Sequence, residues 1–102
     1  MIFNIKIRKE SNIEKLREEV IRLIDESKET VYKIVFYSDE DVQRIMERIS
    51  KRWEEAGCQG RPIDYATPEE LKILHKVAKR VTSKTPAELI AEYRELLMGQ
   101  EL

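Results

Sequence analysis

The sequence predicts an α/β fold, with α+β as the alternative, in which four helices pack against a small, mainly parallel sheet of two to three strands. Three observations predict it. Apolar and polar residues alternate in short β-rich segments, apolar residues recur at helical spacing in four longer stretches, and hydroxyl–carboxylate pairs mark the helix starts. The 102 residues fit one domain, 1–102, with a single core.

The strands are expected in three segments. In "IFNIKIR" (residues 2–8) apolar and polar side chains alternate, and "VYKIVFY" (31–37) is rich in β-branched and aromatic residues. "PIDYA" (62–66) offers a short third strand. A helix between the first two segments favours a parallel pair with a right-handed crossover. The expected order is therefore strand, helix, strand, helix, short strand, helix, helix.

The helix starts follow one rule, because each has a hydroxyl residue three positions before a carboxylate. This capping box satisfies free amide groups in the first turn of a helix. The pairs are Ser11–Glu14, Ser38–Asp41, Thr67–Glu70 and Thr85–Glu88. Pro68 and Pro86 follow two of the caps, where the missing N–H group costs nothing.

An apolar stripe runs along each predicted helix, so one face of every helix must be covered. The four stripes comprise Ile13, Leu16, Val20, Leu23 and Ile24; Val42, Ile45, Met46, Ile49, Trp53 and Ala56; Leu71, Leu74, Val77, Ala78 and Val81; and Leu89, Ile90, Tyr93, Leu96 and Leu97.

Composition excludes several classes of protein. Nineteen basic and twenty acidic residues leave a net charge of -1, which gives no global attraction to nucleic acid or membranes. A single cysteine forms no internal disulfide. No apolar run approaches the ~18 residues of a membrane span, and the first residues lack the pattern of a signal peptide. We expect a soluble protein, cytoplasmic or recombinant, with no targeting signal.

The regular capping boxes, the prolines after two caps and the Glu, Lys and Arg at exposed helix positions resemble the style of computationally designed α/β proteins. Charge-rich proteins of thermophiles share much of this texture. The resemblance covers most of the chain in style and implies no activity. The first hypothesis for function is therefore a small scaffold-like or interaction domain with no activity readable from the sequence.

The enzymatic alternative is a cysteine hydrolase of esterase type. Cys58 would be the nucleophile and His75 the base, with Gln59 and Gly60 supplying amide donors to an oxyanion. Arg61 beside the thiol would lower its pKa. The acid that orients the base would be Asp64 or Glu70, and the spacing selects neither. A buried apolar cysteine and an ordinary helix-flank histidine are the competing interpretation.

A second alternative is contact with nucleic acid through a basic stretch near residues 72–84, which contains no acidic residue. The candidate anion-binding residues are Arg61, Lys72, Lys76, Lys79, Arg80 and Lys84. The following helix is acidic, and no aromatic side chains interleave the cations, so this function is less favoured than an interaction domain.

Cofactors and metals are not expected. One histidine and one cysteine are too few for a zinc site, and the three glycines form no phosphate-binding motif. Val35 and Tyr37 would lie on the sheet face opposite Phe36, where an apolar patch would favour a homo-oligomer unless one of the last two helices covers it.

Overall fold

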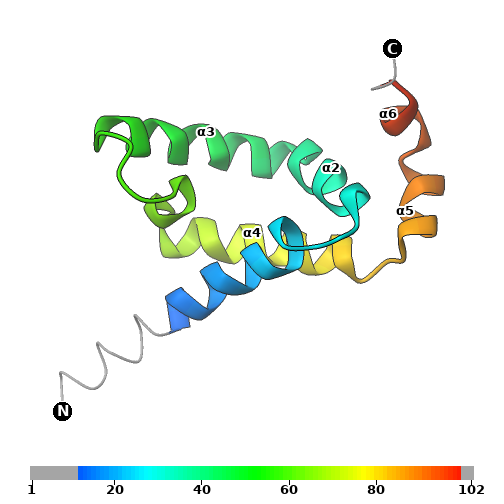
Figure 1. Cartoon of the computed structure of the whole chain (residues 1–102), viewed down its shortest axis with the longest axis horizontal. Coiled ribbons are helices and arrows are strands. Elements are labelled where there is room, and N and C mark those ends of the chain that lie inside the picture. Colours follow the sequence, from blue (N-terminus) through cyan, green and yellow to red (C-terminus); the bar gives the residue numbers. More distant parts are fainter. Residues whose placement is uncertain (1–11, 100–102) are drawn as a thin grey trace.

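A computed structural model describes residues 12–99 as a helical protein, which overturns the predicted α/β fold (Figure 1). Residues 12–99 contain no β-strand, so the predicted parallel sheet is wrong. The first predicted strand, residues 2–8, lies outside the described residues. The second forms a helix and the third forms a 3₁₀ turn.

The helices follow one another with short connections. Residues 12–20 are α-helical and continue into a π-helical turn, η1 (Ile21–Asp25). The remaining elements are α2 (Thr30–Ser38), α3 (Glu40–Glu55), the 3₁₀ turn η2 (Pro62–Tyr65), α4 (Pro68–Thr82), α5 (Pro86–Glu92) and α6 (Arg94–Gly99).

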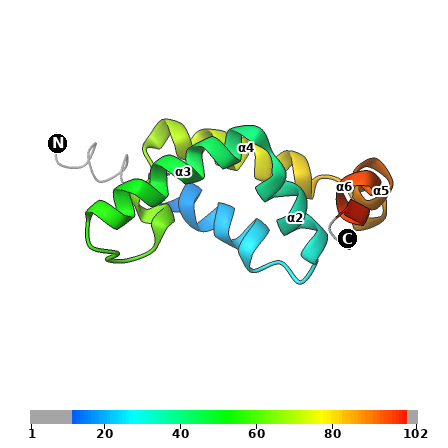
Figure 2. The same ribbon diagram turned by 90° about the horizontal axis from the view of Figure 1, so that it is seen from above.

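The arrangement centres on α3 and α4, which lie side by side and are joined through η2 (Figure 1). The helix over residues 12–25 packs on α4, and α2 closes the other end of the body against α3, α4 and α5. Figure 2 shows α5 and α6 at the end of the molecule opposite the loop that follows α3. The loop after α3 and the pair α5 and α6 therefore form opposite ends of the molecule.

The segment "VYKIVFY" becomes helical because burial outweighs local preference. Val31, Tyr32, Val35 and Phe36 fall on one side of a helix, and Val35 and Phe36 are buried at 3% and 1% exposure. Burying such side chains contributes about 1.5–3 kcal/mol each, whereas helix propensities of ordinary residues differ by at most about 0.7 kcal/mol. Because Val35 lies in the core, the predicted oligomer surface on a sheet face does not exist in the described part.

Two of the predicted capping boxes are confirmed. The amide of Glu70 donates to the Thr67 hydroxyl (3.1 Å), and the amide of Thr67 donates to the Glu70 carboxylate (2.9 Å). Thr85 and Glu88 make the same reciprocal pair at the start of α5, and each box is followed by its proline. Local chemistry therefore specifies where α4 and α5 begin.

The start of α3 differs from the prediction by one residue. Asp39, rather than Ser38, caps the helix, because its carboxylate accepts the amides of Asp41 and Val42. Ser38 still belongs to α2, and its hydroxyl donates to the carbonyl of Val35. The chain turns at Asp39 with an extended backbone, which separates the two helices.

The core draws on every helix from the first to α5. The largest side chains that are completely covered are Phe36, Ile24, Ile49, Leu71, Leu74, Leu89 and Val42. The predicted stripe of α4 is buried throughout, whereas the stripe after Pro86 is not. There Leu89 is 1% exposed and its neighbour Ile90 is 51% exposed, so α5 has an apolar side chain on a face that nothing in the described chain covers.

Candidate functional site

Cys58, the predicted nucleophile, is exposed in the loop after α3. Its backbone has a φ of +59°, and it is the one non-glycine residue of the described chain with a positive φ. Its amide donates to the carbonyl of Trp53 (2.9 Å) and so helps to end α3. No hydrogen bond to the Cys58 thiol occurs among residues 12–99. Its position is explained by helix termination and does not require a catalytic role.

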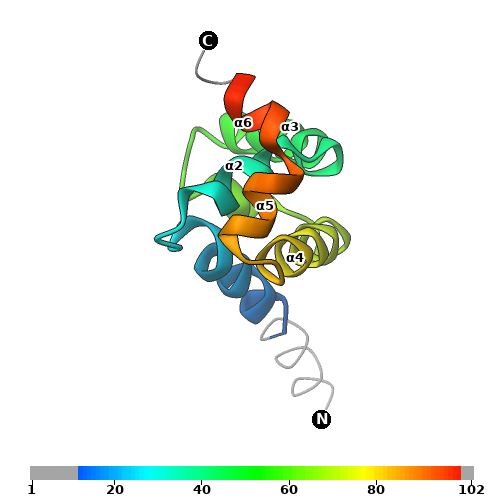
Figure 3. The same cartoon turned by 90° about the vertical axis from the view of Figure 1, so that its right-hand side faces the viewer.

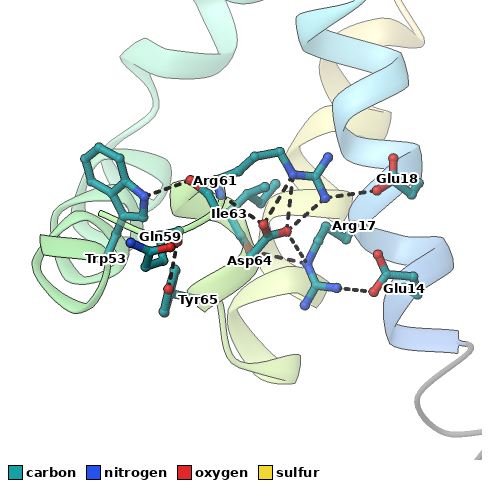
Figure 4. Close-up of polar contacts among 10 residues, drawn as sticks. Glu14, Arg17, Glu18, Trp53, Gln59, Arg61, Ile63, Asp64 and Tyr65 are labelled. Atoms are coloured by element: carbon teal, nitrogen blue, oxygen red, sulfur yellow. Dashed lines mark hydrogen bonds and ion pairs between the residues drawn. The ribbon is translucent and has the colours of Figure 1, made fainter. Parts of the chain in front are cut away.

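The residues that follow Cys58 hold this loop in place (Figure 4). The Trp53 indole donates to the carbonyl of Gly60 (3.0 Å), and the Tyr65 hydroxyl donates to the carbonyl of Gln59 (2.7 Å). Gln59 and Gly60, the predicted oxyanion donors, thus contribute carbonyl acceptors to contacts that fix the loop.

Arg61 takes part in an ionic cluster instead of facing the thiol. Its guanidinium donates to Asp64 (2.8 Å) and to Glu18 of the first helix (3.1 Å), as Figure 4 shows. The hydrogen bonds that Arg61 donates to Asp64 hold the pKa of the Asp64 carboxyl below its usual value. Arg17, whose Nε donates to the carbonyl of Ile63, lies on the other side of Asp64. The cluster fastens η2 to the first helix.

His75, the predicted base, faces the first helix. Its Nε2 atom lies 3.2 Å from a carboxylate oxygen of Glu19, is buried, and makes no hydrogen bond among the described residues. Glu70, a predicted orienting acid, is 6% exposed and receives two hydrogen bonds from Arg52 (2.6 and 3.0 Å). No hydrogen bond joins Cys58 to His75 in the described part, so the geometry gives the hydrolase no support.

Most of the predicted anion-binding cations are already paired with acids of the described chain. Of the six candidates, Arg61 and three cations of the stretch 72–84 pair with acids, while Lys72 and Lys76 make no ion pair within residues 12–99. The pairs are Arg61 with Glu18 and Asp64, Lys79 with Glu19, Arg80 with Asp39, and Lys84 with Glu92. A single phosphate-binding face through residues 72–84 is therefore not what these contacts support.

A groove between α3 and α4 gathers cations from both helices instead. It encloses about 370 Å³. It is lined by Asp41, Arg44, Ile45 and Arg48 from α3 and by Ile73, Lys76, Val77 and Arg80 from α4. On each helix these residues are spaced three or four apart, which places them on one face. We call this feature the α3–α4 groove.

The groove combines positive charge with exposed apolar surface. Arg44 pairs with Asp41 (2.8 Å) and Arg80 with Asp39 (2.8 Å). The other two cations, Arg48 and Lys76, make no ion pair in the part of the chain that the structure describes. Ile73, which belongs to the same lining, is 42% exposed. Such a surface suits an anionic ligand that also has an apolar side.

The sequence analysis identified two of the four cations that line the groove. Lys76 and Arg80 belong to the predicted basic stretch, whereas Arg44 and Arg48 do not. The four-residue spacing of Arg44 and Arg48 shows that they share a helix face, but only the pairing of α3 with α4 places them opposite Lys76. Arg52 fixes the pairing of α3 with α4 near η2, because it donates to Glu70 of α4 and also to the carbonyl of Tyr65 (2.8 Å).

No helix between residues 12 and 99 combines the length and apolar character needed to cross a membrane. The described chain holds no group of three or more His, Cys, Asp and Glu side chains that could bind a metal ion. Comparison of the chain with protein-family models, curated proteins and solved structures found no match.

Proposed function

We propose that this protein is an interaction domain whose α3–α4 groove binds an acidic, amphipathic segment of a partner protein. The observation that carries the proposal is the position of Arg48 and Lys76, two cations with no ion pair among the described residues, beside the exposed Ile73. Carboxylates of the partner would pair with the two cations, and an apolar side chain would cover Ile73.

The expected affinity is modest. An exposed ion pair contributes about 0.2–1 kcal/mol, and covering the exposed part of Ile73 contributes about 1 kcal/mol. Ordering both partners opposes these gains. A dissociation constant on the order of 10 µM corresponds to about −7 kcal/mol, so binding of that strength requires further contacts along the groove beyond these three.

Nucleic acid is the second candidate, favoured by four cations in one groove. Ile73 argues against it, because a phosphate offers nothing to an apolar side chain. Asp39 and Asp41 also place two carboxylates beside the cations, where they repel phosphates. An acidic protein segment with an apolar face faces the same two acids but suits the groove better, because its apolar side chain can cover Ile73.

The test is fluorescence anisotropy with a labelled helical peptide that carries Glu on one face and Leu on the neighbouring face. The double variant Arg48→Glu/Lys76→Glu is expected to bind at least tenfold more weakly than the wild type. Lys15→Glu/Lys28→Glu makes the same change of charge at exposed positions outside the groove and is expected to bind as the wild type does.

Equal weakening in the two double variants would show a general effect of charge and contradict the groove. A 20-base-pair duplex that bound more tightly than the peptide, and lost affinity in the groove variant, would assign the groove to nucleic acid instead.

A further inference from the structure

The directions of α3 and α4 set the order of charges along the α3–α4 groove. Asp39 at the start of α3 pairs with Arg80 near the end of α4 (2.8 Å), and Arg52 near the end of α3 pairs with Glu70 at the start of α4 (2.6 Å). The two helices therefore run in opposite directions, as Figure 1 shows. Figure 3 views the molecule from the end where α3 begins and α4 finishes, with α5 in front. We call this the α5 end of the groove and the other the η2 end.

At the α5 end, the charges of the groove are already paired. The Arg44 guanidinium donates to Asp41 (2.8 Å), and that of Arg80 donates to Asp39 (2.8 Å). A carboxylate of a partner would have to compete with Asp41 and Asp39 for these cations, and it would be repelled by both. A basic side chain of the partner meets two carboxylates instead.

Positive charge without an ion pair is confined to the middle of the groove. Arg48 lies four residues before Arg52, and Lys76 lies four residues before Arg80, so both fall between the bridges at the two ends. Both are exposed and make no ion pair within residues 12–99. Carboxylates of a partner therefore find open cations in the middle, beside Ile73.

An acid also marks the η2 end. Glu69 lies four residues before Ile73 and seven before Lys76, so it is on the same face of α4, one turn beyond the lining of the groove. It is exposed and makes no ion pair in the described part of the chain. Arg52, one turn beyond Arg48 on α3, is held by Glu70 and adds no open cation there.

The unpaired charges of the groove thus have an acid beyond them at each end. Counted from the bridges at the two ends, the order along the groove is Asp41, Lys76, Arg48 and Glu69, at intervals of about one helical turn. The two open cations are in the middle, and one acid lies about a turn beyond them on either side.

We infer that Asp41 and Glu69 determine the specificity of the groove. The inference rests on the proposed function and specifies its partner. The partner's carboxylates lie within about one helical turn, where they meet Arg48 and Lys76, and basic residues lie about one turn beyond them on each side. Asp41 and Glu69 attract these bases and repel a segment whose negative charge continues past the middle of the groove.

The experiment is fluorescence anisotropy with two labelled helical peptides. Both have a Leu on the face that covers Ile73 and two Glu one turn apart. The base-ended peptide has Lys one turn beyond the Glu pair on each side, and the acid-ended peptide has Glu at those two positions. The base-ended peptide is expected to bind at least fivefold more tightly. General attraction of negative charge to a cationic groove predicts the opposite order, because the acid-ended peptide is the more negative.

The double variant Asp41→Asn/Glu69→Gln removes both acids. It is expected to reduce the ratio of the two affinities at least threefold, mainly because the acid-ended peptide binds more tightly. Glu26→Gln/Glu29→Gln makes the same change of charge outside the groove and is expected to keep the ratio of the wild type. All four positions are exposed, so both variants are expected to keep the helical circular dichroism of the wild type.

Three results would overturn the inference. Equal or tighter binding of the acid-ended peptide to the wild type removes the specificity and leaves the proposed function standing, because both peptides have the central carboxylates. A ratio that is unchanged in Asp41→Asn/Glu69→Gln assigns the discrimination to other residues. If neither peptide binds, the proposed function and the inference both fail.

Discussion

The two ends of the molecule are held in different ways. At one end, the loop after α3 and the turn η2 are fixed by hydrogen bonds and ion pairs, from Trp53 to Gly60, Tyr65 to Gln59, and Arg61 to Asp64 and Glu18. At the other end, α5 is anchored through the single buried side chain Leu89, and its outer face is open. The loop end satisfies its polar groups internally, whereas the α5 end leaves Ile90 half exposed.

The difference shows how charged residues are used in a chain that is 38% charged. At the loop end, charges of opposite sign pair across elements that are distant in sequence and so fix the fold. In the α3–α4 groove, four cations lie with the exposed Ile73, and two of them make no ion pair within residues 12–99. The charges at the loop end are paired within the fold, whereas those of the groove are suited to binding another molecule.

The largest effect is expected from Leu89→Ala, which removes the one buried apolar side chain of α5. Truncating a completely buried leucine costs about 3 kcal/mol of unfolding free energy, through lost burial and the cavity left behind. Urea unfolding measures this change, and amide exchange should show faster exchange in residues 86–93. Ile90→Ala is the matched control, because the half-exposed neighbour should cost less than about 1 kcal/mol. Equal costs at both positions would contradict the assignment of the buried face.

The next largest effect is expected from Arg52→Ala, at the loop end of the molecule, and it depends on pH. Arg52→Ala leaves the buried Glu70 carboxylate without its two charged donors, at a cost of about 2 kcal/mol at neutral pH. In the wild type, the hydrogen bonds from Arg52 hold the pKa of Glu70 below its unfolded value, against the opposing effect of burial.

The direction of this pH dependence follows from the number of protons that the folded and unfolded chains bind. Between the two pKa values of Glu70 the unfolded chain binds more protons than the folded chain, so this contribution is present above about pH 5 and is lost as the pH falls. The difference in stability between the wild type and Arg52→Ala should therefore shrink in acid. Unfolding curves from pH 7 to pH 3 measure it, and a difference that grows in acid would refute the role given to this pair. Arg44→Ala, which removes an exposed pair, should cost less than about 1 kcal/mol.

The smallest effect is expected from Cys58→Gly. Glycine adopts the left-handed backbone at this position without the steric conflict of a Cβ atom, which costs about 1 kcal/mol, but it also loses more entropy on folding. The net expectation is a stabilisation of up to about 1 kcal/mol in thermal unfolding. Gly57→Ala, at a φ of +80°, should change stability in the opposite direction. A substantial loss of stability in Cys58→Gly would show that the side chain has a packing role.

The candidate site was only partly predictable. Lys76 and Arg80 stand out in a stretch free of acids, but their neighbours Arg44 and Arg48 are separated from them by about 30 positions and alternate with acids along α3. Whether a cation faces an acid of its own fold, as Lys79 faces Glu19, or an open groove depends on which helices become neighbours. Spacing along one helix contains no information about that choice.

The sequence alone determined the starts of α4 and α5 and the buried face of α4, since capping hydroxyls, prolines and helical apolar spacing act over a few residues. The tertiary structure decided the state of "VYKIVFY". Its β-branched and aromatic residues favour a strand locally, but a helix buries Val35 and Phe36 in a core shared with α3, α4 and α5. The free energy of burial comes from contacts with residues that are distant in sequence. Here it is larger than the local strand preference of the segment, so the segment is helical.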